Sequence, residues 1–275
     1  MRFANSNALA LIRSSHPIPC LAVASFSALL AVGLGLPPER CWIIFAAVLL
    51  QQISVGLSND WIDYERDKAA NRSDKPTVTG LVKVSQLRIG SLTAAVLALV
   101  LAFAIGGSAG ITMIVMLIAG WSYNLGLKLG WASVMPYAVG FGSIPIFVGM
   151  AASEPFWVAG WIVLAAALLG VSAHFANVLP DMQADKLTGV RALPHLMGQR
   201  FSALVISISA LAATLLVVTQ SRDLPPAVAA FGLFATVLLV GLASWFSLWK
   251  QPPRMTFTML ILASLVNVIL LMVGA

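Results

Sequence analysis

Long apolar runs separated by short charged segments constrain this chain more than any other feature of its sequence. The 275 residues are 60% hydrophobic and 9% charged, with a mean hydropathy of +0.94, whereas soluble domains carry about 25% charged residues. A helix needs about 20 apolar residues to cross a bilayer. Nine runs approach or exceed this length: 18–36, 41–57, 89–106, 111–125, 131–152, 156–179, 201–219, 227–249 and 255–273. We expect an all-α polytopic membrane protein, with nine transmembrane helices around a central cavity and residues 1–275 in one domain.

The basic residues are distributed unevenly between the two sides that nine spans define. Fourteen of the sixteen Lys and Arg residues fall on the side of the N-terminus: Arg2, Arg13, Arg66, Lys68, Arg72, Lys75, Lys83, Arg88, Lys128, Lys186, Arg191, Arg200, Lys250 and Arg254. Arg40 and Arg222 fall on the other side. Because basic residues concentrate in cytoplasmic loops, we expect a cytoplasmic N-terminus and an external C-terminus, in the plasma (inner) membrane of a prokaryote. The net charge of +6 then reflects topology and requires no nucleic-acid partner.

The N-terminal region and the two cysteines do not indicate a secreted, disulfide-bonded protein. No small-x-small cleavage site follows the first apolar run before Pro37, so we expect no removable signal peptide. Cys20 and Cys41 would begin successive spans on opposite sides of the membrane, beyond the about 7 Å between Cα atoms that a disulfide allows. We expect two free thiols and no obligate protein partner.

Polar residues recur with helical spacing at the ends of two apolar runs. Two sets share the spacing i, i+4, i+8: Asn59, Asp63 and Asp67 after the second run, and Asn177, Asp181 and Asp185 after the sixth. Residues four apart share a face of a helix, where like charges repel each other. Cations should therefore lie among these carboxylates. Each set is followed by a basic, proline-broken loop, so the two form a weak internal repeat.

The donor atoms of these two motifs predict a magnesium site. Oxygen ligands without His or Cys suit Mg²⁺, which proteins hold with one or two carboxylates and substrate phosphates. The predicted metal ligands are Asn59, Asp60, Asp63, Asp67, Asp181 and Asp185. Nearby cations suited to phosphate oxygens are Arg72, Lys75, Lys128, Lys186 and Arg191. A metal-bridged diphosphate next to an apolar cavity predicts an isoprenyl diphosphate as the ligand.

Four other side chains each allow two interpretations. Tyr123 and Lys128 could face the cavity or anchor the protein at the membrane interface, where aromatic and basic residues concentrate. His16 could face the cavity or lie solvated at the start of a helix. His174 could point at the site or lie in the core, bonded to a neighbouring helix.

The sequence resembles the UbiA superfamily of intramembrane prenyltransferases. The resemblance rests on the two Asn-x3-Asp-x3-Asp motifs, on Tyr123-x4-Lys128 and on the segment 189–194, Gly-Val-Arg-Ala-Leu-Pro, and covers nearly the whole chain. It implies a helical bundle open laterally to lipid, in which Mg²⁺ ions bridge aspartates and the diphosphate. It also implies transfer of the prenyl group from an isoprenyl diphosphate to an aromatic or other lipophilic acceptor in the membrane.

The resemblance assigns roles to particular residues. It implies that Asn59, Asp63, Asp67, Asp181 and Asp185 bind metal and diphosphate, that Lys128 holds diphosphate oxygens and that Tyr123 faces the allylic carbon. Together with the cations named above, we therefore expect these catalytic residues: Asp63, Asp67, Asp181, Asp185 and Tyr123. The expected diphosphate-binding residues are Asn59, Asn177, Arg72, Lys75, Lys128 and Arg191. Two positions depart from the family pattern, because His16-Pro17 and Lys75-Pro76 stand where many members have Arg-Pro.

Two functions from other classes stay open. A transferase that moves a sugar phosphate onto a polyprenyl phosphate would use the same fold, although no further sugar-binding motif is evident. A cation transporter would place its acidic residues near the bilayer midplane, whereas these lie at the ends of spans, which counts against transport.

Overall fold

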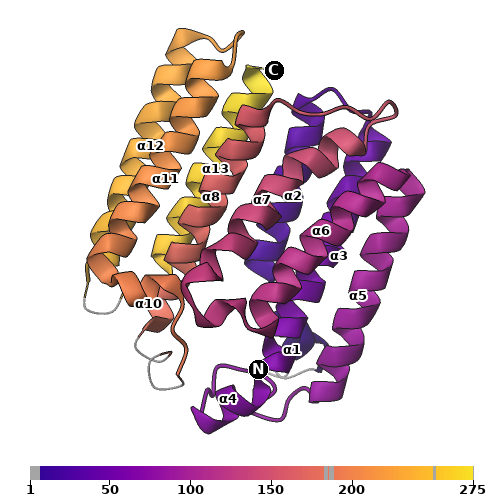
Figure 1. Ribbon diagram of the computed structural model, residues 1–275, viewed down its shortest axis with the longest axis vertical. Helices are drawn as coiled ribbons and strands as arrows, with labels where there is room; N and C mark the ends of the chain where they lie inside the picture. Colours follow the sequence, from indigo (N-terminus) through magenta and orange to yellow (C-terminus); the bar gives the residue numbers. More distant parts are fainter. Residues whose placement is uncertain (1–6, 183–184, 186–188, 250–251, 275) are drawn as a thin grey trace.

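Every regular element in the described part of the chain is a helix, and the long helices lie roughly side by side along one axis (Figure 1). The computed structural model describes residues 7–182, 185, 189–249 and 252–274. Within them, eight helices are long and apolar enough to cross a membrane, and the number is nine when the bent pair of α1 (Asn7–Ser14) and α2 (Pro17–Gly33) is counted as one span. The prediction of an all-α membrane protein with nine spans is confirmed.

The helices fall into nine long elements and several short ones. The long helices are α2 (Pro17–Gly33), α3 (Pro38–Ile62), α5 (Val84–Ile105), α6 (Gly107–Leu125), α7 (Met135–Met150), α8 (Gly160–Val178), α11 (Gln199–Gln220), α12 (Pro226–Ser247) and α13 (Met255–Val273). The short elements are α1 (Asn7–Ser14), α4 (Tyr64–Ala69), η2 (Leu127–Leu129), η3 (Trp131–Val134), η4 (Leu179–Asp181) and α10 (Leu193–Met197). Of these, α1, α4 and α10 lie at the lower end in Figure 1. We call it the motif end, because α3 and α8 both finish there with a motif.

The long helices close into a ring. Helix α2 packs against α3 and α13, α7 packs against α6 and α8, and α8 also contacts α11. Helices α3, α7, α8 and α11 bury more of their surface than α5 and α12 do. The helices that carry the two motifs are thus inner helices, while the outer ones present large apolar side chains such as Phe103 of α5 and Phe231 of α12, as contact with lipid requires. Cys20 and Cys41 are buried free thiols, as predicted.

The first span is broken at Ser15 and His16, which the sequence predictions did not include. Helices α1 and α2 meet at 60°. His16 adopts a left-handed conformation with φ 55°, and Pro17 begins α2, where the missing N–H of proline costs no helical hydrogen bond. The Cys20 thiol donates to the Ser15 carbonyl oxygen at 2.9 Å, which satisfies one backbone group that the break leaves open.

This break rests directly on a glycine of α3. A Cβ on Gly56 would lie 2.4 Å from the carbonyl oxygen of Ser15 and 2.9 Å from its carbonyl carbon. We expect Gly56→Ala to push the break away from α3 and to lower the thermal unfolding temperature in detergent, since overpacking costs about 1–3 kcal/mol. The matched control is Gly241→Ala in α12, where a Cβ meets no atom within 4 Å. Equal unfolding temperatures for the two variants would contradict this account.

Candidate active site

The first motif begins with an amide network that joins α3 to α6. Asn59 Nδ2 donates to Asp63 Oδ2 at 3.3 Å and to Asn124 Oδ1 at 3.1 Å. Asn124 Nδ2 donates in turn to the Val55 carbonyl oxygen at 2.9 Å and to Ser58 Oγ at 2.8 Å. The network fixes the orientation of both amides, so that the Asn59 amide faces the carboxylate of Asp63.

The predicted stripe of Asn59, Asp63 and Asp67 continues across the junction between α3 and α4. The Asp63 N–H donates to the Asn59 carbonyl oxygen at 3.0 Å, and the Asp67 N–H donates to that of Asp63 at 2.8 Å, so the spacing of four residues keeps its helical geometry. The Asp67 side chain is buried. Burial raises the pKa of Asp67, and the cations Lys75 and Arg72 oppose this shift.

Two cations hold the carboxylate of Asp63. Lys128 Nζ lies 2.5 Å from Oδ1 and 2.6 Å from Oδ2, and the Arg66 guanidinium also pairs with Oδ1. Gly126, with φ 151°, allows the chain to turn from α6 into η2, which carries Lys128. Burial lowers the pKa of Lys128 to about 7, and Arg66 adds to this shift. Because Lys128 is only 6% exposed, its position supports the cavity interpretation over an interfacial anchor.

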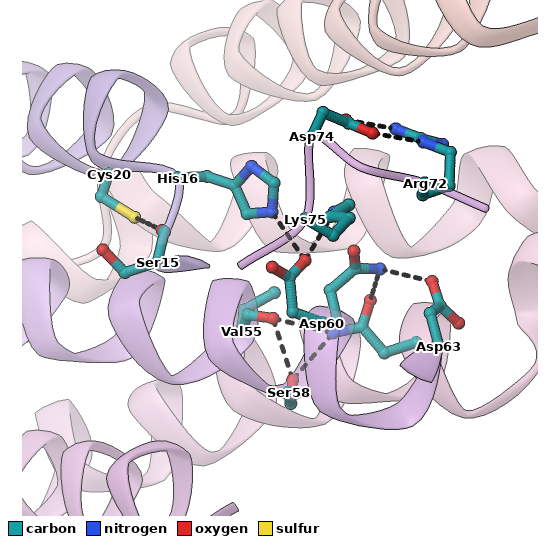
Figure 2. A network of polar contacts seen from close by, with 12 residues as sticks. Ser15, His16, Cys20, Val55, Ser58, Asp60, Asp63, Arg72, Asp74 and Lys75 are labelled. Carbon is teal, nitrogen blue, oxygen red and sulfur yellow. Dashed lines mark hydrogen bonds and ion pairs between the residues drawn. The ribbon is translucent and has the colours of Figure 1, made fainter. Parts of the chain in front are cut away.

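Asp60 faces away from Asp63 and belongs to a separate network (Figure 2). Lys75 Nζ donates to Asp60 Oδ1 at 2.6 Å, and His16 Nε2 lies 3.2 Å from the same oxygen. At 3.6 residues per turn, Asp60 lies about 100° around the helix from Asn59, which turns it toward the break before α2. The Asp60 carboxylate is 1% exposed, so its two partners offset the cost of burying its charge.

Arg72 and Asp74 form a bidentate pair in the loop after α4. Nε and Nη2 of Arg72 each lie 2.9 Å from a carboxylate oxygen of Asp74, the fork geometry that gives strong charge-assisted hydrogen bonds. The pair raises the pKa of Arg72 and lowers that of Asp74 to about 2. The guanidinium is thereby held in place at the motif end.

The second motif leads from α8 toward α10. Asn177 Nδ2 donates to the Tyr137 hydroxyl oxygen on α7 at 3.3 Å. Asp181 ends η4. Asp185 Oδ2 lies 3.4 Å from Nε2 of His195 on α10. The motif is therefore tied to two elements, α7 and α10, that sequence spacing alone does not connect to it.

Carboxylates of both motifs shift the pKa of the same two cations, although the motifs are far apart in the sequence. Asp74 has the largest effect on the pKa of Arg72, and Asp181 and Asp67 raise it as well. Burial lowers the pKa of Lys128, whereas Asp67 and Asp185 both raise it. Since such electrostatic effects weaken with distance and with screening, carboxylates of the two motifs lie around one set of cations.

An aromatic cluster lies next to these charges, deeper in the bundle. The Tyr123 ring lies 5.2 Å from Tyr137 and 5.7 Å from His174 between centroids, and Tyr137 stacks on Phe141 at 6.3 Å with 11° between the ring planes. His174 is fully buried, and its Nε2 shares a hydrogen bond with Ser133 Oγ at 3.0 Å. This bond to η3 supports the core interpretation of His174.

The donor set fits Mg²⁺ chemically, but cations already engage the carboxylates of Asp60 and Asp63. Within residues 7–182, 185, 189–249 and 252–274, no three His, Cys, Asp or Glu side chains converge as a metal cluster. Carboxylate and amide oxygens from the two motifs are the ligands that Mg²⁺ prefers. Asp63 would have to exchange Lys128 and Arg66 for the metal, while Asp60 lies in its own network.

Of the other predicted cations, Arg191 is exposed before α10, and Lys186 lies outside the described residues.

Four residues around the site were absent from the sequence predictions of site residues: Arg66, Asn124, Tyr137 and His195. Arg66 follows Asp63 by three residues, and this spacing alone could have indicated an ion pair on one helix face. Asn124 adjoins Tyr123, which was predicted. Tyr137 and His195 reach the motifs only through the packing of α7 and α10, so no local sequence pattern indicates them.

A cage of carboxylates and cations at one end of an apolar bundle suits an amphiphilic ligand with a polyanionic head. The fold and the site thus define an integral membrane enzyme with a charged site at one end of an apolar bundle. The chain belongs to the UbiA prenyltransferase family, whose family model matches residues 18–267, and it is a prenyltransferase.

Individual relatives agree with this membership. The chain is 26% identical over 250 residues to digeranylgeranylglyceryl phosphate synthase of Thermococcus sibiricus, covering 88% of this chain and 86% of the relative. It is 26% identical over 200 residues to the bacteriochlorophyll synthase 33 kDa chain of Cereibacter sphaeroides, covering 68% and 66%.

Solved structures show the same fold. A UbiA homolog from Aeropyrum pernix K1 superposes with a TM-score of 0.75 at 18% identity, covering 90% of this chain and 94% of that chain. A UbiA homolog from Archaeoglobus fulgidus bound to DMAPP and Mg²⁺ superposes with a TM-score of 0.74 at 16% identity, covering 95% and 97%.

Proposed function

We propose that this protein transfers the prenyl group of an isoprenyl diphosphate to a lipophilic acceptor within the membrane, with Mg²⁺ held by the carboxylates of the two motifs. One observation carries the proposal: both motifs border the same aromatic pair. Lys128 lies 2.5 Å from Asp63 of the first motif, Asn177 of the second motif donates to the Tyr137 hydroxyl oxygen, and the Tyr137 ring lies 5.2 Å from that of Tyr123. The charged cage suits a diphosphate, and the bundle behind it suits a hydrocarbon chain. The Archaeoglobus fulgidus homolog with DMAPP and Mg²⁺ supports this assignment.

The cations of the site can exchange a carboxylate partner for the phosphate oxygens of a bound diphosphate. Lys128 and Arg66 now neutralise Asp63. When bound by Asp63, Asp67, Asp181 and Asp185, Mg²⁺ would supply Lewis-acid stabilisation of the diphosphate. Lys128 and Arg66 could then donate to phosphate oxygens, and buried donors of this kind stabilise charge that develops on a leaving group.

The aromatic cluster is placed to protect the reacting carbon. As the carbon–oxygen bond breaks, its electron pair leaves with the diphosphate and positive charge develops on the allylic carbon. The face of the Tyr123 ring can stabilise a cation, and the surrounding apolar walls exclude water that would otherwise capture it. The acceptor then forms the new bond to this carbon and releases a proton.

A direct assay tests the proposed function. Purified protein in vesicles is incubated with Mg²⁺, with labelled dimethylallyl, geranyl or geranylgeranyl diphosphate, and with a panel of acceptors. The names of the relatives make a glycerophosphate lipid and a tetrapyrrole the first two acceptors to include, followed by aromatic acids. Mg²⁺-dependent prenyl transfer is the expected result. Transfer of a sugar phosphate to a polyprenyl phosphate, without prenyl transfer, would contradict the proposal in favour of the other transferase class.

We also propose that the motif end faces the cytoplasm, with the N-terminus on that side and the C-terminus outside. Reporter fusions after Lys83 and Lys128 are expected to report a cytoplasmic position, and fusions after Ser108, Ser153 and Ser221 an external one, because basic residues concentrate at the motif end. A cytoplasmic signal from Ser108 or Ser153 would contradict this orientation.

A further inference from the structure

One buried hydroxyl joins three segments at the motif end. Ser133 Oγ on η3 accepts a hydrogen bond from the Leu193 N–H at 2.8 Å and lies 3.0 Å from Nε2 of His174 on α8. Leu193 is the first residue of α10, where a backbone N–H has no partner within the helix. Ser133 and His174 are both fully buried. We call this contact of η3, α8 and the start of α10 the serine junction.

The two hydrogen bonds of the serine junction determine where its protons lie. The Leu193 N–H uses one lone pair of the Ser133 oxygen, so the hydroxyl keeps its own hydrogen to donate. Among the hydrogen bonds of the described residues, His174 Nε2 is the acceptor that this hydrogen can reach. Nε2 is therefore the unprotonated nitrogen of a neutral imidazole, and the ring proton lies on Nδ1.

The rest of the His174 ring makes no further hydrogen bond within the described part of the chain. Its Nδ1 is buried without a hydrogen-bond partner there, and the ring packs against Tyr137 with 4.8 Å between centroids. A buried polar atom that lacks a partner costs free energy, which an apolar side chain would avoid. The bond to Ser133 is the contact here that an apolar side chain could not make.

Helix α10 connects the serine junction to the far end of the second motif. The Val190 N–H donates to the Asp185 carbonyl oxygen at 3.0 Å, and Nε2 of His195 on α10 lies 3.4 Å from the Asp185 carboxylate. The start of α10 is in turn fixed by the bond from Leu193 to Ser133. The position of Asp185 relative to α8 therefore depends on the docking of α10.

We propose that Ser133 and His174 are positioning residues that hold the second motif in the arrangement that binds Mg²⁺ and the diphosphate. This inference rests on the proposed function. The near end of the motif is tied to the same place, because Asn177 donates to Tyr137, whose ring packs on His174. A site that is already ordered binds its ligand more tightly, since binding then pays no cost for ordering it.

Removal of the hydroxyl tests this inference in the purified full-length protein. Ser133→Ala leaves the Leu193 N–H without its acceptor and His174 Nε2 without its donor. Binding of inorganic diphosphate with Mg²⁺, measured by calorimetry, should weaken by about tenfold or more, as expected if about one molecule in ten keeps the motif in place. Hydrogen exchange in the segment 189–198, measured without ligand, should become faster.

Two controls separate positioning from a general loss of stability. Ser172→Ala removes another buried hydroxyl of α8, which donates to the Ile206 carbonyl oxygen of α11 at 3.1 Å. It should lower the unfolding temperature about as much as Ser133→Ala does and leave diphosphate affinity unchanged. His174→Gln keeps a polar atom that can accept from Ser133 and should retain most of the affinity that His174→Leu loses.

The outcomes distinguish this inference from the proposed function. Unchanged diphosphate affinity in Ser133→Ala, or an equal loss in Ser172→Ala, would overturn the inference alone. If Ser133→Ala does not fold, equal affinities of His174→Gln and His174→Leu would overturn it. Absence of both prenyl transfer and diphosphate binding in the wild type would overturn the proposed function instead.

Discussion

Replacing one aspartate in each motif, as Asp63→Asn or Asp181→Asn, is expected to reduce the rate of prenyl transfer by orders of magnitude. Each substitution keeps the size of the side chain and one oxygen but removes a negative charge. Charge stabilisation by a bound metal is worth several kcal/mol, and each ~1.4 kcal/mol corresponds to a factor of ten in rate. Steady-state kcat/KM values for the two single variants and the double variant measure the effect.

The double variant decides whether the motifs form one site. If they share a metal-bridged diphosphate, the double variant should lose much less activity than the product of the single effects, since residues that act as a unit are not additive. Chelator should abolish activity, and Mg²⁺ should restore it better than the larger Ca²⁺. Asp223→Asn, an exposed acid between α11 and α12, is the matched control. A wild-type rate in chelator, or multiplicative effects of the two substitutions, would refute a shared site.

Lys128→Met is expected to weaken binding of the diphosphate substrate and to slow its ionisation. Methionine keeps most of the apolar stem but removes the ammonium that now lies 2.5 Å from Asp63. Hydrogen bonds to charged groups contribute about 1.5–3 kcal/mol, so we expect kcat/KM for the donor to fall by about tenfold to a hundredfold. Binding of inorganic diphosphate, measured by calorimetry with Mg²⁺, should weaken in parallel.

Lys83→Met is the control for this loss of charge. Lys83 is exposed at the start of α5, at the same end of the bundle but outside the two motifs. Its substitution should leave donor binding unchanged. If both variants behave alike, then Lys128 acts only through the general positive charge of the motif end.

The broad architecture could be predicted from the sequence because it depends on local physical limits. Nine apolar runs of spanning length predicted nine spans, since a bilayer sets the length of a helix that crosses it. Polar residues at i, i+4 predicted that Asn59 and Asp63 would meet, and they do. The break at His16 was missed, because it depends on a left-handed backbone conformation and on the close approach of Gly56 to Ser15.

The partners within the site depend on how distant helices pack, which the sequence patterns do not encode. Asp60 was predicted to bind metal together with Asp63, which stays a prediction. In this structure its neighbours His16 and Lys75 come from the break before α2 and from the loop after α4. Tyr137 meets Asn177 only because α7 lies against α8. Tertiary packing decides which cation pairs with which carboxylate. The resemblance to a family predicted only some of these pairings.

The buried Asp60 has a consequence for the order in which the protein is assembled in the membrane. Its carboxylate joins segments that leave the ribosome in sequence: His16 first, then α3, and Lys75 last. Removing a partner from a buried charge is strongly destabilising, so we expect the packing of α3 against the first span to become fully stable only when the loop beyond α4 brings Lys75 to Asp60. Assembly of the first motif would then be coupled to synthesis of the chain through residue 75.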